Sequence, residues 1–193
     1  MKAKELAVYC SLAIGCLLLA SCEKFYPDPI DPRLPVYSES GLRQAGAIVD
    51  GLPYVDYVRF SLFGGSRYSQ IDVFDQDSIQ MILFITEKTT QNKSLIMNIT
   101  IRNLGENDWE MMQRGHGKRF ALDNPSVQVV LSPPGEYWEY LPVERINGQI
   151  TLKMIPGPKI MAGTFGFNAR NPDGPTVRAE YGRYDYFYTE ISK

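Results

Sequence analysis

Histidine and cysteine, which supply most catalytic bases, thiol nucleophiles and zinc ligands, are nearly missing from this chain. His116 is the one histidine, and the three cysteines, Cys10, Cys16 and Cys22, lie near the N-terminus. A Ser-His-Asp triad or a histidine-rich metal site would therefore have to use His116. Glycines flank His116 on both sides, which is typical of a solvated loop tip and unsuited to a preorganised active site. The sequence after Cys22 has no thiol for catalysis or zinc binding.

An excess of positive charge is also missing. The 193 residues carry 20 Lys and Arg against 22 Asp and Glu, a formal net charge of −2. This balance gives no support for nucleic-acid binding or for a polybasic contact with anionic lipid. No phosphate-binding glycine loop occurs, and we expect no cofactor. Hydrophobic residues make up 44% of the chain, enough for the core of a globular domain.

The N-terminus has the pattern of an export signal. Lys2 and Lys4 precede residues 6–20, which carry no charge, and charge returns at Glu23. The uncharged run is typical of a secretory signal, and it is shorter than the roughly 20 apolar residues of a transmembrane helix. We therefore expect residues 1–21 to be a signal peptide.

The tetrapeptide Leu19-Ala20-Ser21-Cys22 resembles the lipobox of bacterial lipoproteins. The resemblance implies that the chain is cut before Cys22 and that Cys22 is diacylated, usually with acylation of its new amine. Two or more acyl chains hold a protein on a membrane, whereas one binds reversibly. We therefore expect Cys22 to be the lipidation site and the membrane to be a partner through this anchor. An ordinary cleaved signal is the alternative.

Prolines recur through residues 25–35, at positions 27, 29, 32 and 35. They favour an extended polyproline II spacer, which at about 3.1 Å per residue would reach roughly 34 Å. We therefore assign residues 22–37 to the lipidated cysteine and a proline-rich tether, and residues 38–193 to a single domain. A disordered leader would have the same composition.

Alternation of apolar and polar residues dominates the sequence after the tether. It is clear in three segments, residues 58–63, 95–101 and 150–154. Such alternation indicates strands that bury one face. Residues 79–85 are almost all apolar and predict a central strand buried on both faces, residues 127–131 predict another strand, and helix is expected only near residues 107–112. The fold class is therefore all-β, an antiparallel β-sandwich of about ten strands, with a meandering calycin-like β-barrel as the alternative.

Turn residues divide these strands. Asp50-Gly51 and Asn147-Gly148 both suit two-residue hairpins, and residues 171–175 suit a longer turn. Before this turn, Phe165, Phe167 and Ala169 should share one face. After it, the same applies to Val177, Ala179 and Tyr181. Gly182 then shifts the alternation, as a glycine at a β-bulge often does.

Residues 161–169 (MAGTFGFNA) and 182–185 (GRYD) resemble the C-terminal signature of small uncharacterised lipoproteins of Bacteroidetes-type bacteria. Residues 47–54 resemble their opening strand pair, and Tyr184 replaces an expected Phe. The resemblance implies an outer-membrane address and an all-β fold, and it carries no known activity. Surface export in such lipoproteins accompanies an acidic run after the cysteine. Here Glu23 is followed at once by a lysine, so the periplasmic and cell-surface faces both stay open.

Two groups of carboxylates are candidates for chemistry. Asp72, Asp75 and Asp77 lie beside an expected turn and are weak candidates for a calcium site, because their spacing does not fit the EF-hand. A solvated turn is the favoured interpretation. Glu136 and Glu139 are the pair that glycoside hydrolysis would need, but residues three apart on a strand point to opposite faces.

Aromatic residues give the main candidate for binding. Tyr137, Trp138 and Tyr140 follow a Pro-Pro-Gly turn. Aromatic rings with polar tips suit stacking on sugars or contact with proteins. The last strand adds three more tyrosines, at positions 184, 186 and 188. The alternative is that all of these rings pack in the sheet, and Glu139 next to Trp138 favours an inward-pointing Trp138.

These observations favour a lipid-anchored, non-catalytic binding or accessory protein of the cell envelope, with a glycan or another envelope protein as its partner. A structural or assembly lipoprotein without a small ligand is the second hypothesis. A hydrolase is the third, because the sequence contains no recognised catalytic motif.

Overall fold

The structure, a computed structural model, describes residues 28–29, 31–56, 69–75, 77–91, 93–132, 141–143, 145–170 and 176–192. Strands dominate these residues, and the all-β prediction is confirmed. In chain order the elements are β1 Gln44–Val49, β2 Leu52–Val55, β3 Gln70–Phe74, β4 Ser78–Glu87, β5 Ser94–Ile101, α2 Glu106–Gln113, β6 Lys118–Ala121, β7 Val127–Ser132, β8 Leu141–Pro142, β9 Arg145–Ile155, β10 Ile160–Arg170 and β11 Thr176–Ile191.

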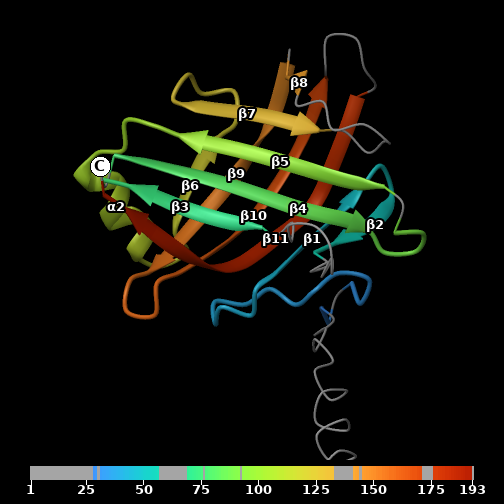
Figure 1. Cartoon of the computed structure of the whole chain (residues 1–193), viewed down its shortest axis with the longest axis horizontal. Helices are drawn as coiled ribbons and strands as arrows, with labels where there is room; N and C mark the ends of the chain where they lie inside the picture. The colour runs from blue at the N-terminus through green and yellow to red at the C-terminus, as the bar shows by residue number, and fades with distance from the viewer. Residues whose placement is uncertain are drawn as a thin grey trace, which may run out of the picture.

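The strands form one continuous sheet that closes on itself in its middle. The paired order is β6-β9-β10-β11-β1-β2-β4-β5-β7-β8, and β3 pairs with both β11 and β4. The five strands β11, β1, β2, β4 and β3 therefore make a closed ring, in which the β3–β11 pair is parallel. This closed ring corresponds to the β-barrel, which the sequence allowed as the alternative to a β-sandwich. Figure 1 shows the remaining strands as extensions of this ring, with β5 and β7 in the front layer and β9 and β10 behind.

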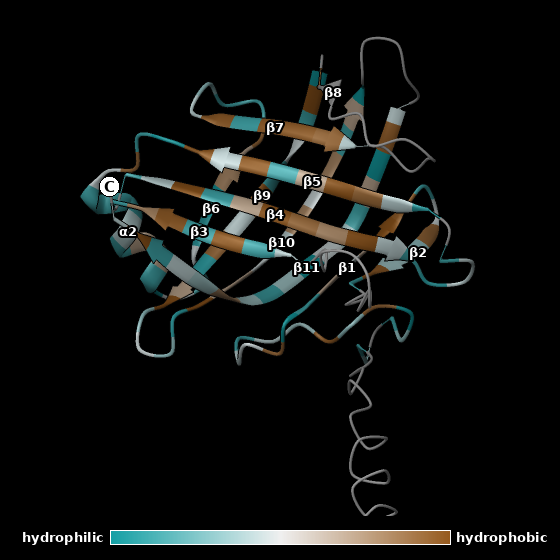
Figure 2. Ribbon diagram, in the orientation of Figure 1, coloured by the Kyte–Doolittle hydropathy of each residue, from teal (hydrophilic) through white to brown (hydrophobic). Residues whose placement is uncertain are grey.

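The core lies between these two layers, and strand alternation explains it. On β5, Leu95, Met97, Ile99 and Ile101 are all no more than 1% exposed, while Asn98 and Thr100 are half-buried. Figure 2 shows the corresponding apolar bands along β4 and β5. β4 corrects the prediction for residues 79–85, because only its second half is buried on both faces. Half-burial of Gln80 and Ile82 shows that the outer face of its first half is partly open.

The two predicted two-residue turns have different outcomes. Asp50 and Gly51 have φ of 49° and 84° and join β1 to β2, as expected for a tight hairpin. The Asn147-Gly148 prediction is wrong, because both residues lie inside β9 and stay in register with β10. A Cβ at Gly148 would lie 2.6 Å from the Cα of Phe167, so close approach of β10 accounts for this glycine. The actual β9–β10 turn is at residues 156–159.

The closing hairpin explains two glycines and two aromatic residues at positions 161–169 and 182–185. A Cβ at Gly163 would lie 2.6 Å from the hydroxyl of Tyr184, and a Cβ at Gly182 would lie 2.5 Å from the ring of Phe165. Each glycine therefore makes space for an aromatic ring on the neighbouring strand. The predicted β-bulge is present opposite Gly166, but Tyr181 does not share the buried face of Val177 and Ala179 and is 69% exposed.

The segment before β1 packs against the barrel. Leu34 is 0% exposed, and the Asp28 carboxylate forms an ion pair with Arg183. The backbone N–H groups of Ser40, Gly41 and Leu42 donate to the carboxylate of Asp185, at 3.2, 2.8 and 3.1 Å. We call residues 31–43 the N-terminal segment. The part of the expected tether from Asp28 onward thus belongs to the packed domain, because buried contacts hold it there.

The helix α2 forms where it was expected. The carboxylate of Asp108 accepts the N–H of Gly105 at 2.9 Å and forms an ion pair with Lys118 on β6. The Lys118 ammonium, together with the Gly105 N–H, lowers the pKa of Asp108. No helix within the described ranges has the length and apolar character needed to cross a membrane.

Candidate functional site

Several residues singled out in the sequence lie outside the described residues. These are the lipidation candidate Cys22, the aromatic candidates Tyr137, Trp138 and Tyr140, and the carboxylates Glu136 and Glu139. The tyrosines of the last strand are described and are not a binding face. Tyr184, Tyr186 and Tyr188 are 1%, 5% and 4% exposed and belong to the core. Burial raises the pKa of Tyr184, whose hydroxyl donates to the Thr151 carbonyl oxygen at 2.8 Å.

Asp72, Asp75 and Asp77, the weak calcium candidates, lie on β3 and in the turn that follows it. Asp72 is 8% exposed and accepts a hydrogen bond from the Gln70 amide at 2.5 Å. The carboxylate of Asp77 accepts from the Ser78 hydroxyl at 2.7 Å. Throughout the described part of the chain, no three His, Cys, Asp or Glu side chains converge as metal ligands would. The solvated-turn interpretation therefore fits Asp77, whereas Asp72 is buried. His116 is exposed in the loop after α2, as expected.

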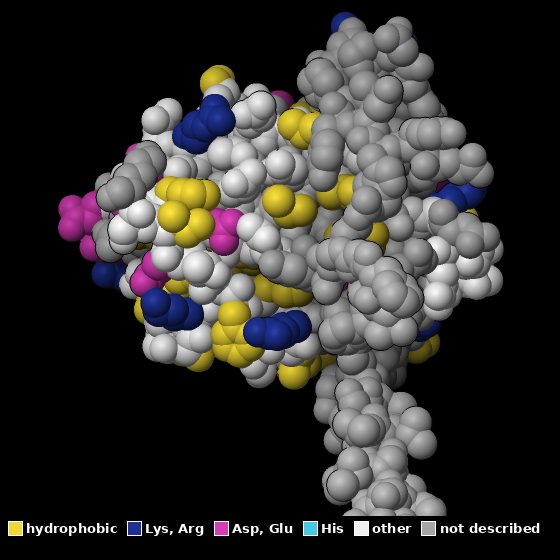
Figure 3. Space-filling model, viewed as in Figure 1, with side chains coloured by type: hydrophobic (Ala, Val, Ile, Leu, Met, Phe, Trp, Pro, Cys, Tyr) yellow, Lys and Arg dark blue, Asp and Glu magenta, His cyan; other side chains and the backbone are white. Residues whose placement is uncertain are grey.

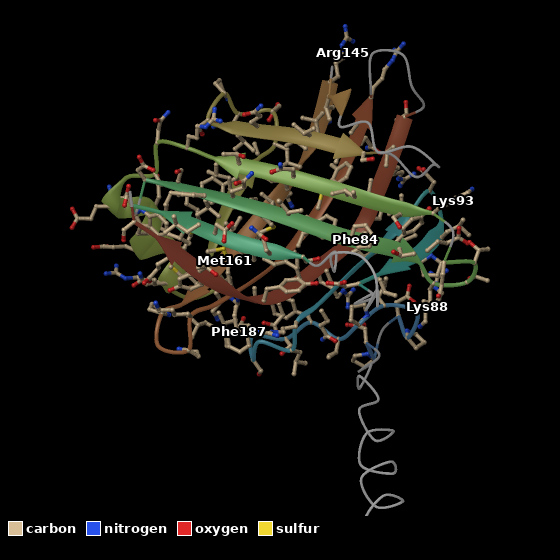
Figure 4. All side chains as sticks on the ribbon, viewed as in Figure 1. Phe84, Lys88, Lys93, Arg145, Met161 and Phe187 are labelled. Atoms are coloured by element: carbon tan, nitrogen blue, oxygen red, sulfur yellow. The ribbon has the colours of Figure 1, made fainter. Side chains whose placement is uncertain are left out.

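A cleft of about 940 Å³ is formed by described residues. It lies between β7 and the adjoining ends of β9 and β10. We call it the arginine cleft and define it by its charged and amide side chains, Arg102, Asp123, Asn124, Gln128, Arg145, Asn147, Asn168 and Arg170. Figure 4 places Arg145 at the end of the molecule away from the N-terminal segment.

Positive charge dominates the arginine cleft. Its described lining has three arginines and one carboxylate, although the whole chain has a net charge of −2. Arg145 and Arg170 stand directly opposite each other on β9 and β10, an arrangement in which like charges repel. Among the described residues neither guanidinium has an ion-pair partner, and the guanidinium of Arg102 donates to the amide oxygen of Gln128 at 3.1 Å. An anion between the two opposed guanidinium groups would relieve the repulsion.

The rest of the cleft is apolar or amide-lined. Its apolar lining includes Leu122, Val127 and Val129, which are buried, and Val143 and Ile146, which are half-buried. β8 pairs only with Val130 and Leu131 of β7. No described strand pairs with the remaining residues of β7 on the side where β8 lies. The described lining residues include no histidine or cysteine and a single carboxylate. This chemistry suits retention of a polar or anionic ligand.

Sequence reasoning missed the arginine cleft because its residues are dispersed. Arg102, Arg145 and Arg170 come from three separate segments and belong to no local motif. A weak signal was present, since Arg170 directly precedes the expected turn at residues 171–175. To place Arg170 opposite Arg145, one must know the register between β9 and β10. The expected turn at Asn147-Gly148 was incompatible with this register, because both residues lie inside β9.

A second hollow of about 470 Å³ lies beside α2. Its lining includes Trp109, Tyr188 and Met154 together with the carboxylates of Asp75 and Glu190. Glu190 already accepts a hydrogen bond from the Lys159 ammonium at 2.8 Å. Because the Glu190 carboxylate is already paired, this hollow carries a weaker functional argument than the arginine cleft.

Figure 3 shows the front face over β4, β5 and β7, where hydrophobic side chains are interspersed with polar ones. No large area of one charge sign covers the described part of this face. Neither a family model, nor a curated protein, nor a solved structure matches this chain.

Proposed function

We propose that this protein is a lipid-anchored, non-catalytic binding module of the outer membrane that holds an acidic ligand in the arginine cleft. The observation that carries the ligand class is the opposition of Arg145 and Arg170 without an ion-pair partner among described residues. The lipobox at residues 19–22 and the resemblance to small lipoproteins of Bacteroidetes-type bacteria support the address.

The position of the cleft also supports a role at a membrane. Asp28 is held by Arg183, and six residue steps separate it from Cys22. At about 3.3–3.6 Å per residue, this connection spans at most roughly 20 Å. A lipidated Cys22 would therefore keep the N-terminal segment near the bilayer. Gly41 of this segment packs on Phe187, and Figure 4 shows Phe187 and Arg145 at opposite ends of the molecule. The arginine cleft would then open away from the membrane.

The ligand class is tested by removing the opposed charges. We expect Arg145→Gln/Arg170→Gln to weaken binding of polygalacturonate, a carboxylated polysaccharide, by about tenfold or more, because two charge-assisted contacts are lost. Full-length protein in detergent micelles would be titrated calorimetrically at low and high salt. Binding to the wild type should weaken as salt rises, since exposed charges are screened.

The matched control is Arg114→Gln/Lys159→Gln, which removes the same charge from exposed ion pairs elsewhere. It should leave the affinity within about twofold, as surface changes usually do. If both double variants lost affinity equally, the cause would be the change in net charge. That result would contradict a binding site in the arginine cleft. Release of new reducing ends from the polysaccharide would favour the hydrolase hypothesis instead. A wild type that binds no polyanion would favour the structural hypothesis.

A further inference from the structure

The most exposed aromatic side chain among the described residues has no structural role in the core. Tyr181 is 69% exposed and lies at the β-bulge of β11, opposite Gly166 of β10. Its hydroxyl has no hydrogen bond to any described residue. A large apolar ring held in water at a fixed point of a rigid strand is available for stacking.

The backbone at Tyr181 is unfavourable for a tyrosine. Its φ is 53°, in the left-handed region that glycine and asparagine occupy at least cost. The neighbouring Gly182 does not relieve the backbone at Tyr181, because it is the next residue along the strand. Its lack of a side chain has a different purpose, which is to make space for the ring of Phe165. Stability alone would therefore favour Asn or Gly at position 181. Strained residues of this kind are concentrated at functional sites.

Tyr181 borders a shallow hollow of about 410 Å³ whose chemistry suits a sugar. Gly148 and Gly166 leave its floor without side chains, and Asn147 and Asn168 supply two amides from directly opposed positions. Arg178 and Glu180 complete the rim and are paired with each other at 2.5 Å. Sugar hydroxyls both donate and accept hydrogen bonds, which amides match on both counts. The apolar face of a sugar ring stacks on a tyrosine.

This hollow adjoins the arginine cleft, because Asn147 and Asn168 line both. Along β10, four residue steps separate Arg170 from Gly166, roughly 13 Å at the usual strand rise. A free carboxylate or a single sugar would not cover that distance, whereas a short oligosaccharide would.

We propose that Tyr181 is the stacking platform of a saccharide-binding site and that the ligand is an acidic polysaccharide lying across the ends of β9, β10 and β11. One ring of the chain stacks on Tyr181, the Asn147 and Asn168 amides bind its hydroxyls, and an acidic group reaches Arg145 and Arg170. The acidic part of this inference rests on the proposed function, and the platform rests on Tyr181 and its hollow.

The test replaces the Tyr181 ring with a side chain that tolerates the positive φ at this position. We expect Tyr181→Asn to weaken polygalacturonate binding by about tenfold and to leave the melting temperature unchanged or higher, since Asn tolerates positive φ. Tyr181→Phe, which keeps the ring, should bind within about twofold of wild type. Tyr37→Ala, which removes another exposed aromatic ring, should have no effect on affinity. Wild-type affinity in the Asn variant, or an equal loss in the Phe variant, would overturn the platform.

A second probe separates this inference from the proposed function. Poly-glutamate carries carboxylates without sugar rings, so it should bind more weakly than polygalacturonate and should be insensitive to Tyr181→Asn. If both polymers bind equally, depend on Arg145 and Arg170, and ignore Tyr181, the acidic cleft stands and the saccharide platform fails. If neither polymer binds to the wild-type protein, both proposals fail.

Discussion

At the scale of single residues, the reciprocal fit of glycines and aromatic rings stabilises the closing hairpin. Gly163 gives space to Tyr184, and Gly182 gives space to Phe165. These contacts explain why the signature in residues 161–169 and 182–185 alternates small and aromatic residues. The signature is thus a packing requirement, and it carries no catalytic group.

The first prediction concerns Gly163. A Cβ there would meet the backbone carbonyl oxygen of Thr151 as well as the Tyr184 side chain, and the backbone cannot easily move. Gly163→Ala should therefore lower the free energy of unfolding by about 1–3 kcal/mol or more. The control is Gly157→Ala, where the added Cβ meets nothing within 4 Å. It should be neutral or stabilising by up to about 1 kcal/mol. Urea denaturation measures both, and equal stability of the two variants would contradict the packing explanation.

At the scale of elements, the carboxylate of Asp185 is one of the groups that attach the N-terminal segment to β11. Asp185 is 1% exposed and accepts three consecutive backbone N–H groups from Ser40, Gly41 and Leu42. Because a buried donor that loses its partner is costly, this side chain couples the order of the segment to the end of the sheet.

Asp185→Asn tests this attachment. The amide that replaces the carboxylate has one oxygen acceptor instead of two, so at least one of the three N–H groups loses its charged partner. We expect a loss of about 1–3 kcal/mol in stability and faster hydrogen exchange of the amides at 40–42. Glu190→Gln, on the same strand but 54% exposed at its side chain, is the control and should change neither quantity. Unchanged exchange at 40–42 in the Asp185 variant would show that other contacts hold the segment.

At the scale of the whole molecule, the parallel β3–β11 pair closes the ring of strands. Because the ring is closed, the two ends of the domain keep a fixed position relative to each other. Figure 1 shows the N-terminal segment at the bottom of the view, and Figure 4 shows Arg145, one of the residues of the arginine cleft, at the top. If Cys22 is lipidated, the short connection to Asp28 makes the end of the domain with the N-terminal segment face the bilayer.

Two engineered cysteines test this orientation, because no natural cysteine follows Cys22. Fluorophores would be attached to Pro32→Cys in the N-terminal segment and to Thr176→Cys at the arginine cleft, with the protein in vesicles of brominated lipid. We expect strong quenching at position 32 and little at 176, because quenching requires contact with the lipid. Equal quenching at both positions would contradict the orientation. Cys22→Ser should release the protein from membranes or leave it unprocessed, and normal fractionation of this variant would contradict the lipid anchor.

The sequence by itself determined the all-β class, the strands around Leu95 and Ile150, the helix after Gly105 and the hairpin at Asp50-Gly51. These features depend on local periodicity and on residues adjacent in the chain. The tertiary structure decided that Asn147-Gly148 lies within a strand, because the approach of β10 makes glycine necessary there. It also buried the tyrosines of the last strand, exposed Tyr181 through a bulge, and brought Arg145 opposite Arg170. Register and ring closure are non-local, so no local pattern in the sequence contains them.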